Sequence, residues 1–345
     1  MQSKRTTVTT LLLAVFALLI FLQFRHFRAF NWETFVNETS QARPLNIVFG
    51  IALLYIVYVL RALRWKIMLR PVRKTTTMNL VPATFMGFTG MALLGRAGDF
   101  TRPYLIARKL RMSFSSQIGV WAVERIFDTG SFTLLVAADI LWAPSLRSLP
   151  YYRQFERAGF VLLAIIIVVA IVAVAIKKNP SAIADWVEGA LRLVSEKLAS
   201  AVANRIRAFG NGLNTIQDSS SLLQLIGLSV VIWLLISLSY FAVTHAYPEP
   251  LRSMAISHVI LLMGFSIAGS IVQLPVVGGG AQLLTIGALA NVFEVPQELA
   301  VSCGILLWLV TFVAVTPVGM LLARREHLSW KTLSEASHEV EAATL

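Results

Sequence analysis

Charged residues are scarce in this chain: Asp, Glu, Lys and Arg make up 14% of its 345 residues, whereas 57% are hydrophobic. A mean hydropathy of +0.71 excludes an ordinary water-soluble domain and is typical of a protein that crosses a membrane several times. Acidic residues are the scarcest charged kind, with 18 Asp and Glu against 30 Lys and Arg. In a membrane protein such an excess is expected in loops beside anionic lipid, so no nucleic-acid partner is predicted.

Cysteine and histidine are also rare. The single cysteine, Cys303, cannot form an internal disulfide, and the five histidines show no metal-binding spacing such as HExxH. The sequence contains no nucleophile elbow and no phosphate-binding loop motif. We therefore predict that the chain has no metal, no cofactor and no enzymatic activity.

Long apolar runs make up most of the remaining sequence. Segments near the roughly 20 residues needed to cross a bilayer predict six spans, at 8–24, 45–62, 118–142, 158–176, 222–245 and 299–323. Two further apolar stretches, 79–95 and 255–293, are interrupted by glycine or polar residues, and each is predicted to enter the membrane and turn back. The predicted fold is an all-α polytopic membrane protein with about six transmembrane helices and two broken re-entrant hairpins.

The distribution of Lys and Arg predicts the orientation. With the N-terminus inside the cell, the inner segments carry 22 of these residues and the outer segments carry 7. Because Lys and Arg accumulate near span ends on the cytoplasmic side, both termini are predicted to be cytoplasmic. The expected location is the cytoplasmic (inner) membrane of the cell.

The order of the spans predicts an inverted repeat. Residues 1–157 would form the first membrane repeat, 158–323 the second, and 324–345 a cytoplasmic tail. Inverted repeats with broken membrane segments are a recurring transporter design, because opposed half-helices create a polar site that can open to either side. If 255–273 and 281–296 are each full crossings, the C-terminus stays inside but the symmetry fails.

The segment between the two repeats, 181–210, has apolar residues at helical spacing and basic residues among its polar positions. This pattern predicts an amphipathic cytoplasmic helix that lies on the membrane surface. It would serve either as a connector or as a sensor of anionic lipid.

Three charged residues lie deep within the predicted span at 118–142. Glu124 and Asp128 are four residues apart and share one helix face, and Arg125 is three residues before Asp128 and could reach it. Because an unpaired charge at this depth costs about 2.5–3.5 kcal/mol, we expect these side chains to face a polar interior and to pair. They form either a ligand site or an ion-pair cluster that only fixes helix packing.

A second group of polar residues follows the first hairpin, on the predicted cytoplasmic side: Arg96, Gly98, Asp99 and Arg102. Guanidinium groups can bind phosphate with two parallel hydrogen bonds, and glycine permits close backbone approach. Asp99 could hold one arginine in position when no ligand is bound. With the acids of the neighbouring span, these residues predict a charged cluster suited to an anionic lipid headgroup; the alternative is cytoplasmic charge bias plus turn chemistry.

The second hairpin contains the stretch QLPVVGGGAQ, in which Pro275, Gly278, Gly279 and Gly280 should unwind a helix. Unwinding frees backbone N–H groups for hydrogen bonding to a ligand. The side chain of Gln282 could add a further hydrogen-bonding group beside them. Such groups are tolerated at membrane depth only where protein or a wet cavity satisfies them. The stretch is therefore either part of a substrate-binding site or a passive hinge.

Together these motifs resemble the membrane region of lysylphosphatidylglycerol synthases and its stand-alone, flippase-like relatives, over approximately residues 10–325. The Gly-acidic-x-x-Arg element of that family is similar to Gly98-Asp99-Phe100-Thr101-Arg102, with aspartate where glutamate is expected, and the Glu-Arg-x-x-Asp element is Glu124-Arg125-Ile126-Phe127-Asp128. The Pro-x-x-Gly-Gly element keeps Pro275, Gly278 and Gly279 but has only Gln282 near its acidic position.

The resemblance implies movement of lipids between leaflets, because that activity is associated with the membrane region of the family. The synthase activity belongs to a separate soluble domain, and about 22 residues follow the last predicted span. We therefore favour a transporter of an anionic or polyprenyl-linked lipid headgroup, with membrane lipids and a lipid- or glycan-synthesis enzyme as expected partners. The alternatives are a non-transporting scaffold of such an enzyme complex and an intramembrane lipid-modifying enzyme.

The transporter hypothesis gives the charged residues two roles. Arg96, Arg102 and Arg125 would contact phosphate, whereas Asp99, Glu124 and Asp128 would orient these arginines or exchange protons.

Overall fold

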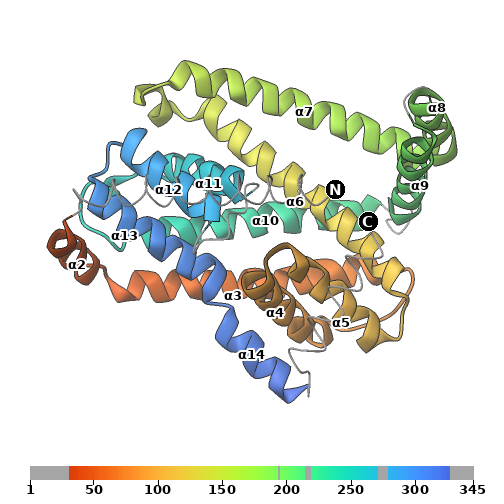
Figure 1. Ribbon diagram of the computed structural model, residues 1–345, viewed down its shortest axis with the longest axis horizontal. Helices are drawn as coiled ribbons and strands as arrows, with labels where there is room; N and C mark the ends of the chain where they lie inside the picture. Colours follow the sequence, from red (N-terminus) through yellow and green to blue (C-terminus); the bar gives the residue numbers. More distant parts are fainter. Residues whose placement is uncertain (1–30, 193–194, 214–218, 271–278, 327–345) are drawn as a thin grey trace, which may run out of the picture.

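The computed structural model is helical throughout its described parts (Figure 1), which are residues 31–192, 195–213, 219–270 and 279–326. The predicted first span at 8–24 lies outside the described residues, as does almost all of the predicted tail.

Five described helical segments are long and apolar enough to cross a membrane: α3 (Pro44–Leu69), α4 (Thr77–Leu94), α7 (Tyr152–Lys178), α10 (Ser219–Thr244), and Gln297–Arg325, which combines α13 (Gln297–Trp308), a π turn at Leu309–Val313 and α14 (Thr316–Arg325). Four of them coincide with the predicted spans at 45–62, 158–176, 222–245 and 299–323. The chain is thus an all-helical, multi-pass membrane protein.

The predicted span at 118–142 is the continuous helix α6 (Phe114–Trp142), which is 29 residues long. At about 1.5 Å per residue this helix is long enough to cross a bilayer. It is not one of the five segments named above, because the charged residues Glu124, Arg125, Asp128 and Asp139 interrupt its apolar sequence. In Figure 1 it runs diagonally across the molecule, between α7 and the layer that contains α10.

The sequence predicts that the first hairpin turns back within residues 79–95, and this position of the turn is wrong. α4 continues through this stretch, and the chain turns only at Gly95, whose φ of 62° suits glycine. A 3₁₀ turn (Gly95–Phe100) then leads into α5 (Thr101–Leu110), which packs back against α4. The hairpin therefore has α4 as one arm and α5 as the other.

The glycines that suggested a break in α4 instead allow the two arms to touch. A Cβ atom added to Gly87 would collide with the Cβ of Arg102, and one added to Gly90 would lie 2.6 Å from the Thr101 hydroxyl. Gly98 packs in the same way against the carbonyl of Gly90. Sequence reasoning read Gly87 and Gly90 as helix breakers, whereas close packing holds them inside a continuous helix.

The second predicted hairpin, 255–293, consists of α11 (Ile256–Ser270) and α12 (Gly279–Asn291), which pack against each other. Their closest approach is at Gly269, where an added Cβ would collide with the carbonyl of Gly280. The connection between them lies outside the described residues. Whether the two helices form a re-entrant hairpin or two full crossings stays a prediction.

The linker at 181–210 is two helices rather than the single surface helix that its pattern predicts. α8 (Pro180–Arg192) and α9 (Glu196–Leu213) pack against each other at the end of α7 (Figure 1). An ion pair of 2.7 Å joins Arg207 to Asp185 across the pair. Hydrogen bonds from Arg192 and Arg207 lower the pKa of the Glu188 carboxyl. The apolar residues of this segment thus serve partly for contact between its two helices.

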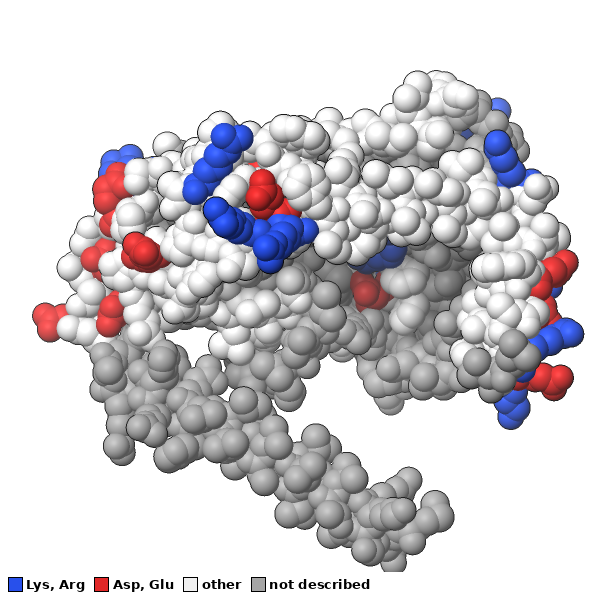
Figure 2. Space-filling view, turned by 90° about the horizontal axis from the view of Figure 1, so that it is seen from above, with Lys and Arg blue, Asp and Glu red and all other residues white. Residues whose placement is uncertain are grey.

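α3 and α10 pack against each other along their length and run antiparallel. The Ser239 hydroxyl donates to the Gly50 carbonyl at 2.9 Å near one end, and Arg70 donates to the Gln224 amide oxygen at 3.2 Å near the other. The hairpin α4–α5 packs beside α3, and the hairpin α11–α12 packs beside α10. Over most of the face in Figure 2 the described residues carry no charge, as lipid contact requires.

The remaining short helices occupy the predicted outer side of the bundle. α2 (Trp32–Ser40) packs on α13, and two 3₁₀ turns, Pro144–Ser148 and Leu251–Ser253, follow α6 and α10.

We expect Gly87→Ala to destabilise the fold, because the added methyl group meets the Arg102 backbone and Cβ. Overpacking of this kind costs about 1–3 kcal/mol. Gly119→Ala in α6 is the matched control, since a Cβ there would meet nothing within 4 Å. Thermal unfolding of the two purified variants in detergent provides the measurement, and equal melting temperatures would show that the contact between the hairpin arms is not tight.

The predicted orientation can be measured by cysteine labelling, because the native Cys303 is buried. Arg73 and Arg153 are both exposed, on opposite sides of the segment that contains α4, α5 and α6. Arg153→Cys should react with a membrane-impermeant maleimide in intact cells, and Arg73→Cys only after permeabilisation. The reverse pattern would overturn the orientation, and labelling of both in intact cells would contradict an odd number of crossings between them.

Candidate functional site

Five charged side chains form a buried cluster between three helices. Arg61 and Arg64 come from α3, Arg102 from α5, and Glu124 and Asp128 from α6. Each of these residues is at most 7% exposed. We refer to these five residues as the buried ion cluster.

Asp128 binds both arginines of α3. Its two carboxylate oxygens accept from Arg61 Nη1 and Arg64 Nη1, each at 2.7 Å. Arg64 Nη1 also donates to the hydroxyl of Ser229 on α10, at 3.0 Å. One carboxylate thus ties α6 to α3, and the same guanidinium extends the connection to α10.

Glu124 completes the cluster one turn earlier on α6. Its Oε1 accepts from Arg64 Nη2 at 2.7 Å and from Arg102 Nη1 at 3.2 Å, and its Oε2 pairs with Arg102 Nη2. The Arg102–Glu124 pair is therefore bidentate, the geometry that gives the strongest arginine–carboxylate interactions. It fixes α5 against α6.

The spacing of these residues explains why they meet. Arg61 and Arg64 are three apart on α3, and Glu124 and Asp128 are four apart on α6, so each pair lies on one helix face. Arg102 approaches because Gly87 offers no side chain in its way. Trp65 of α3 supports this arrangement: its indole lies 4.4 Å from the Arg102 guanidinium.

The buried ion cluster carries an excess positive charge, because three guanidiniums face two carboxylates. Removing ions from water is expensive unless each is paired and hydrogen-bonded. Aromatic rings provide part of the compensation for the extra cation: the Phe88 ring lies 5.2 Å from the Arg61 guanidinium and 5.3 Å from that of Arg102.

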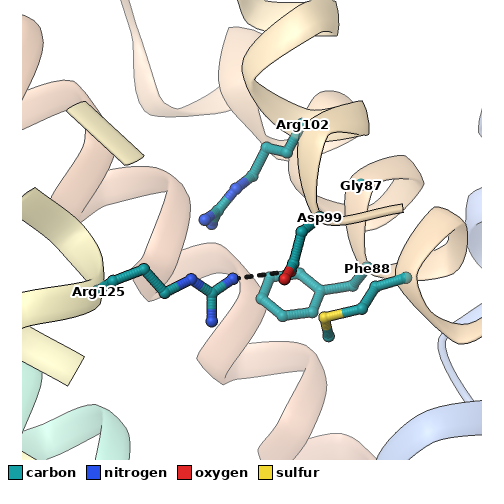
Figure 3. A pocket seen from close by; sticks show the side chains of 6 residues that line it. Gly87, Phe88, Asp99, Arg102 and Arg125 are labelled. Atoms are coloured by element: carbon teal, nitrogen blue, oxygen red, sulfur yellow. Dashed lines mark hydrogen bonds and ion pairs between the residues drawn. The ribbon is translucent and has the colours of Figure 1, made fainter. Parts of the chain in front are cut away.

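A small open pocket adjoins this cluster on the α4–α5 side (Figure 3). Its empty volume is about 190 Å³, including space open to solvent, and its lining residues are Gly87, Phe88, Met91, Asp99, Arg102 and Arg125. Arg102 belongs both to the buried ion cluster and to the pocket wall. The pocket therefore borders one member of the buried ion cluster.

Asp99 and Arg125 form a separate ion pair across the pocket (Figure 3). Arg125 Nη2 donates to Asp99 Oδ1 at 3.0 Å, and the two side chains are 37% and 27% exposed. The Arg125 guanidinium also lies 5.4 Å from the Trp121 ring. Since this pair is partly in contact with solvent, it is much easier to separate than the pairs of the buried ion cluster.

The structure brings most of the predicted first-hairpin and α6 residues together. Asp99 does hold an arginine, as expected, and that arginine is Arg125. The prediction that Arg125 pairs with Asp128 is wrong, because α3 supplies both partners of Asp128. Gly98 lies in the turn that presents Asp99. Arg96 is in the same turn, and its side chain lies outside the described part of the structure.

The described residues of the second predicted hairpin do not join this site. Pro275 and Gly278 lie outside the described residues. Gly279, Gly280 and Gln282 form the first turn of α12, which packs on α11 and α13, and none of them lines the pocket. Their predicted role in binding finds no support in the geometry of the described residues.

Sequence reasoning missed Arg61 and Arg64. The predicted span ended at 62, so both arginines were counted as cytoplasmic loop charges, whereas α3 continues to Leu69. Two signals could have identified them: their separation of three residues, and the partnerless acids predicted at the same depth on α6. Phe88 was also missed, because an aromatic residue in an apolar helix gives no signal of its own.

In its chemistry this arrangement is suited to binding an anion. Arg102 and Arg125 present guanidiniums at the pocket, and the buried Nε of Arg125 has no hydrogen-bond partner among the described residues. Within the same residues there is no group of three or more His, Cys, Asp or Glu that could hold a metal ion.

Neutralising a buried acid should destabilise the protein far more than neutralising an exposed one. Asp128→Asn leaves two buried arginines short of a partner and should cost about 3–5 kcal/mol. Asp99→Asn removes a partly exposed pair and should cost about 0–1 kcal/mol. Unfolding of both variants, followed by tryptophan fluorescence in detergent, measures the difference. A larger loss for Asp99→Asn would show that the cluster does not stabilise the bundle.

Comparison with known proteins identifies the family. The family described as "Lysylphosphatidylglycerol synthase TM region" matches residues 9–319 of the chain. The "UPF0104 membrane protein" of Methanothermobacter thermautotrophicus (strain ATCC 29096 / DSM 1053 / JCM 10044 / NBRC 100330 / Delta H) is 23% identical over 264 residues, which cover 71% of this chain and 74% of that protein. No solved structure matches. The family match covers most of the length of this chain. The chain therefore belongs to the lysylphosphatidylglycerol synthase TM region family.

Proposed function

We propose that the protein transports a lipid with an anionic headgroup between the two leaflets of the cytoplasmic membrane. The observation that carries the proposal is an excess of guanidinium groups at an open pocket between apolar helices. Charges inside a membrane protein are expensive, and they mark substrate paths more often than packing sites. The proposal assigns no chemical step to the chain.

In the proposed bound state a phosphate lies between Arg102 and Arg125. Both arginines line the pocket, and the unpartnered Nε of Arg125 adds a free donor. Asp99 occupies Arg125 until the phosphate replaces it, because both groups are anions that compete for the same guanidinium. The half-exposed position of this pair makes the exchange inexpensive.

The buried ion cluster has a different role in the proposal, which is to orient Arg102. Glu124 binds both terminal nitrogens of Arg102, and Arg64 holds Glu124 in turn. A guanidinium fixed in this way loses little side-chain entropy when it binds a ligand. Glu124 and Asp128 thus act through the arginines and do not contact the lipid.

We also infer that the two halves form an inverted repeat that rocks about this site. The hairpin helix α4 packs on α14, where the Thr89 hydroxyl donates to the Val315 carbonyl at 3.2 Å. The matching hairpin helix α11 packs on α6, with Gly264 beside Val136. Together with the antiparallel pair α3–α10, these matched contacts support alternating access between inverted halves.

A second function, a non-transporting scaffold of a lipid- or glycan-synthesis complex, is favoured by one observation. Glu124 and Asp128 are fully paired within the protein, which is what a purely structural cluster requires. Such a scaffold would need neither Arg125 nor Asp99. The role of the half-exposed pair therefore separates the two functions.

Transport of a fluorescent phosphatidylglycerol in proteoliposomes tests the proposal. Arg125→Gln should slow transport at least tenfold, because it removes a charge-assisted contact worth about 1.5–3 kcal/mol. Arg192→Gln on α8 is the control: it also breaks a partly exposed ion pair, with Glu188, but it lies in the linker. Both variants should fold, which their melting temperatures check.

Two results would contradict the proposal. Wild-type protein that moves no labelled anionic lipid would leave the scaffold function as the better explanation. Full transport by Arg125→Gln would exclude the pocket as the binding site.

A further inference from the structure

We infer that the π turn at Leu309–Val313 is a hinge, about which α11, α12 and α13 move together against α3, α5 and α6, the helices that the buried ion cluster holds together. The role of this movement in transport rests on the proposed function, to which the inference adds the part of the protein that moves. Three features carry it: the geometry of the π turn, the neighbours of the helices on its two sides, and the uneven distribution of ion pairs.

The span Gln297–Arg325 changes its backbone geometry at the π turn. The Ala314 N–H donates to the Leu309 carbonyl at 2.9 Å, which lies five residues earlier instead of the four of an α-helix. Pro317 follows in the first turn of α14 and has no N–H to donate to the preceding turn. Helices kink where this ladder of hydrogen bonds is interrupted, and π turns are common at functional sites. The angle between α13 and α14 can therefore change here.

Side-chain hydroxyls bind the two carbonyls that follow the π turn. Tyr55 on α3 donates to the Ala314 carbonyl at 2.8 Å, and Thr89 on α4 donates to the Val315 carbonyl at 3.2 Å. Neutral hydrogen bonds contribute little net stability, so these two can favour one angle of the hinge without preventing another. The buried Thr316 hydroxyl has no hydrogen-bond partner among the described residues, although such groups normally have one, and it is available to a second arrangement of the hinge.

The two sides of the hinge pack against different hairpins (Figure 1). α13 packs on α12, whereas α14 packs on α4. Both contacts are close: a Cβ added to Gly319 of α14 would collide with the Thr89 hydroxyl, and one added to Gly304 of α13 would lie 2.5 Å from the Ile286 side chain of α12. An ion pair of 2.8 Å between Lys109 of α5 and Glu326 also ties the end of α14 to the first hairpin. Each side of the hinge therefore moves with its own hairpin.

Ion pairs hold the first hairpin in place but not the second. Arg102 joins the hairpin α4–α5 to Glu124 of α6 within the buried ion cluster. The helices α11, α12 and α13 contain no Lys or Arg and a single acidic residue, Glu298. Within the described part of the chain, no ion pair joins these three helices to the rest of the bundle.

The second hairpin contacts its neighbours through apolar side chains and hydroxyl groups. Gly264 of α11 lies beside Val136 of α6, and the hydroxyls of Tyr240 on α10 and Ser266 on α11 are 3.2 Å apart. Shifting such contacts costs less than separating buried ion pairs. The hairpin α11–α12, together with α13, is thus the part that moves.

The distance between the two ends of the hinged span tests the movement without any transport assay. Spin labels at Gln297→Cys and Arg324→Cys, two exposed positions on opposite sides of the π turn, should show two distance populations by electron paramagnetic resonance in nanodiscs. The native Cys303 is buried and stays unlabelled. Labels at Leu45→Cys and Arg70→Cys, at the two ends of the continuous helix α3, are the control and should show one population. One population for both pairs would overturn the hinge.

Tyr55→Phe should shift the two populations in a defined direction. It removes the donor to the Ala314 carbonyl, so the population with the distance seen in the structure should fall relative to the other by about twofold to tenfold. Tyr151→Phe is the control, because Tyr151 is 61% exposed and lies before α7, outside the hinge. Equal populations in the two variants would contradict a hinge that the Tyr55 hydroxyl holds.

A disulfide between α6 and α11 tests whether transport needs the movement. Val136→Cys with Gly264→Cys should form it, because a Cβ at Gly264 would lie 3.6 Å from a methyl carbon of Val136. Oxidation should stop the transport of fluorescent phosphatidylglycerol, and reduction should restore it. Ile140→Cys with Gly159→Cys is the matched control: a Cβ at Gly159 would lie 3.4 Å from that of Ile140, and this disulfide ties α6 to α7 instead.

The outcomes separate the hinge from the proposed function. Transport that continues with the α6–α11 disulfide formed would overturn the movement of α11 and leave the proposed function in place. Two distance populations in a protein that moves no labelled lipid would support the hinge and reject the proposed function.

Discussion

A carboxylate inside a membrane helix bundle must be surrounded by cations, and this constraint determines how α3, α5 and α6 pack together. Glu124 and Asp128 lie on one face of α6, so the helices that face them must supply guanidiniums. α3 supplies two and α5 supplies one. The close approach of α5 needs Gly87, and the charge balance needs the aromatic rings beside Arg102. Helix order, glycine positions and aromatic positions around the cluster thus follow from two acids.

The protein uses its ion pairs in two different ways. In the buried ion cluster both carboxylates are paired with arginines, and removal of one carboxylate would leave an uncompensated charge in a low-dielectric interior. The Asp99–Arg125 pair is partly exposed and can exchange one anion for another at little cost. Arg102 connects the two, since it is fixed by Glu124 on one side and faces the pocket on the other. The buried ion cluster holds Arg102 in place, and the Asp99–Arg125 pair can open. This combination is suited to reversible anion binding.

Much of the fold and half of the site can be predicted from the sequence, and the rest depends on contacts that local patterns do not contain. Apolar runs predict four of the five described segments that are long and apolar enough to cross a membrane, and they also predict α6. The depth and spacing of Glu124 and Asp128 predict a paired polar interior. Arg61 and Arg64 are lost because hydropathy ends a span at its first arginines, although a helix can continue once those arginines find buried partners. Gly87 is misread as a breaker because its value lies in tertiary contact with Arg102. The partner of Arg125 is misassigned because i, i+3 proximity suggests Asp128, whereas the hairpin turn brings Asp99 closer.

The most direct test is a structure of the protein in nanodiscs that contain phosphatidylglycerol. Phosphate density is expected between the Arg102 and Arg125 guanidiniums, with the Asp99 carboxylate moved away from Arg125 and the buried ion cluster unchanged. A pocket that keeps the Asp99–Arg125 pair, with lipid phosphates only at the outer surface of the bundle, would contradict anion binding at this site.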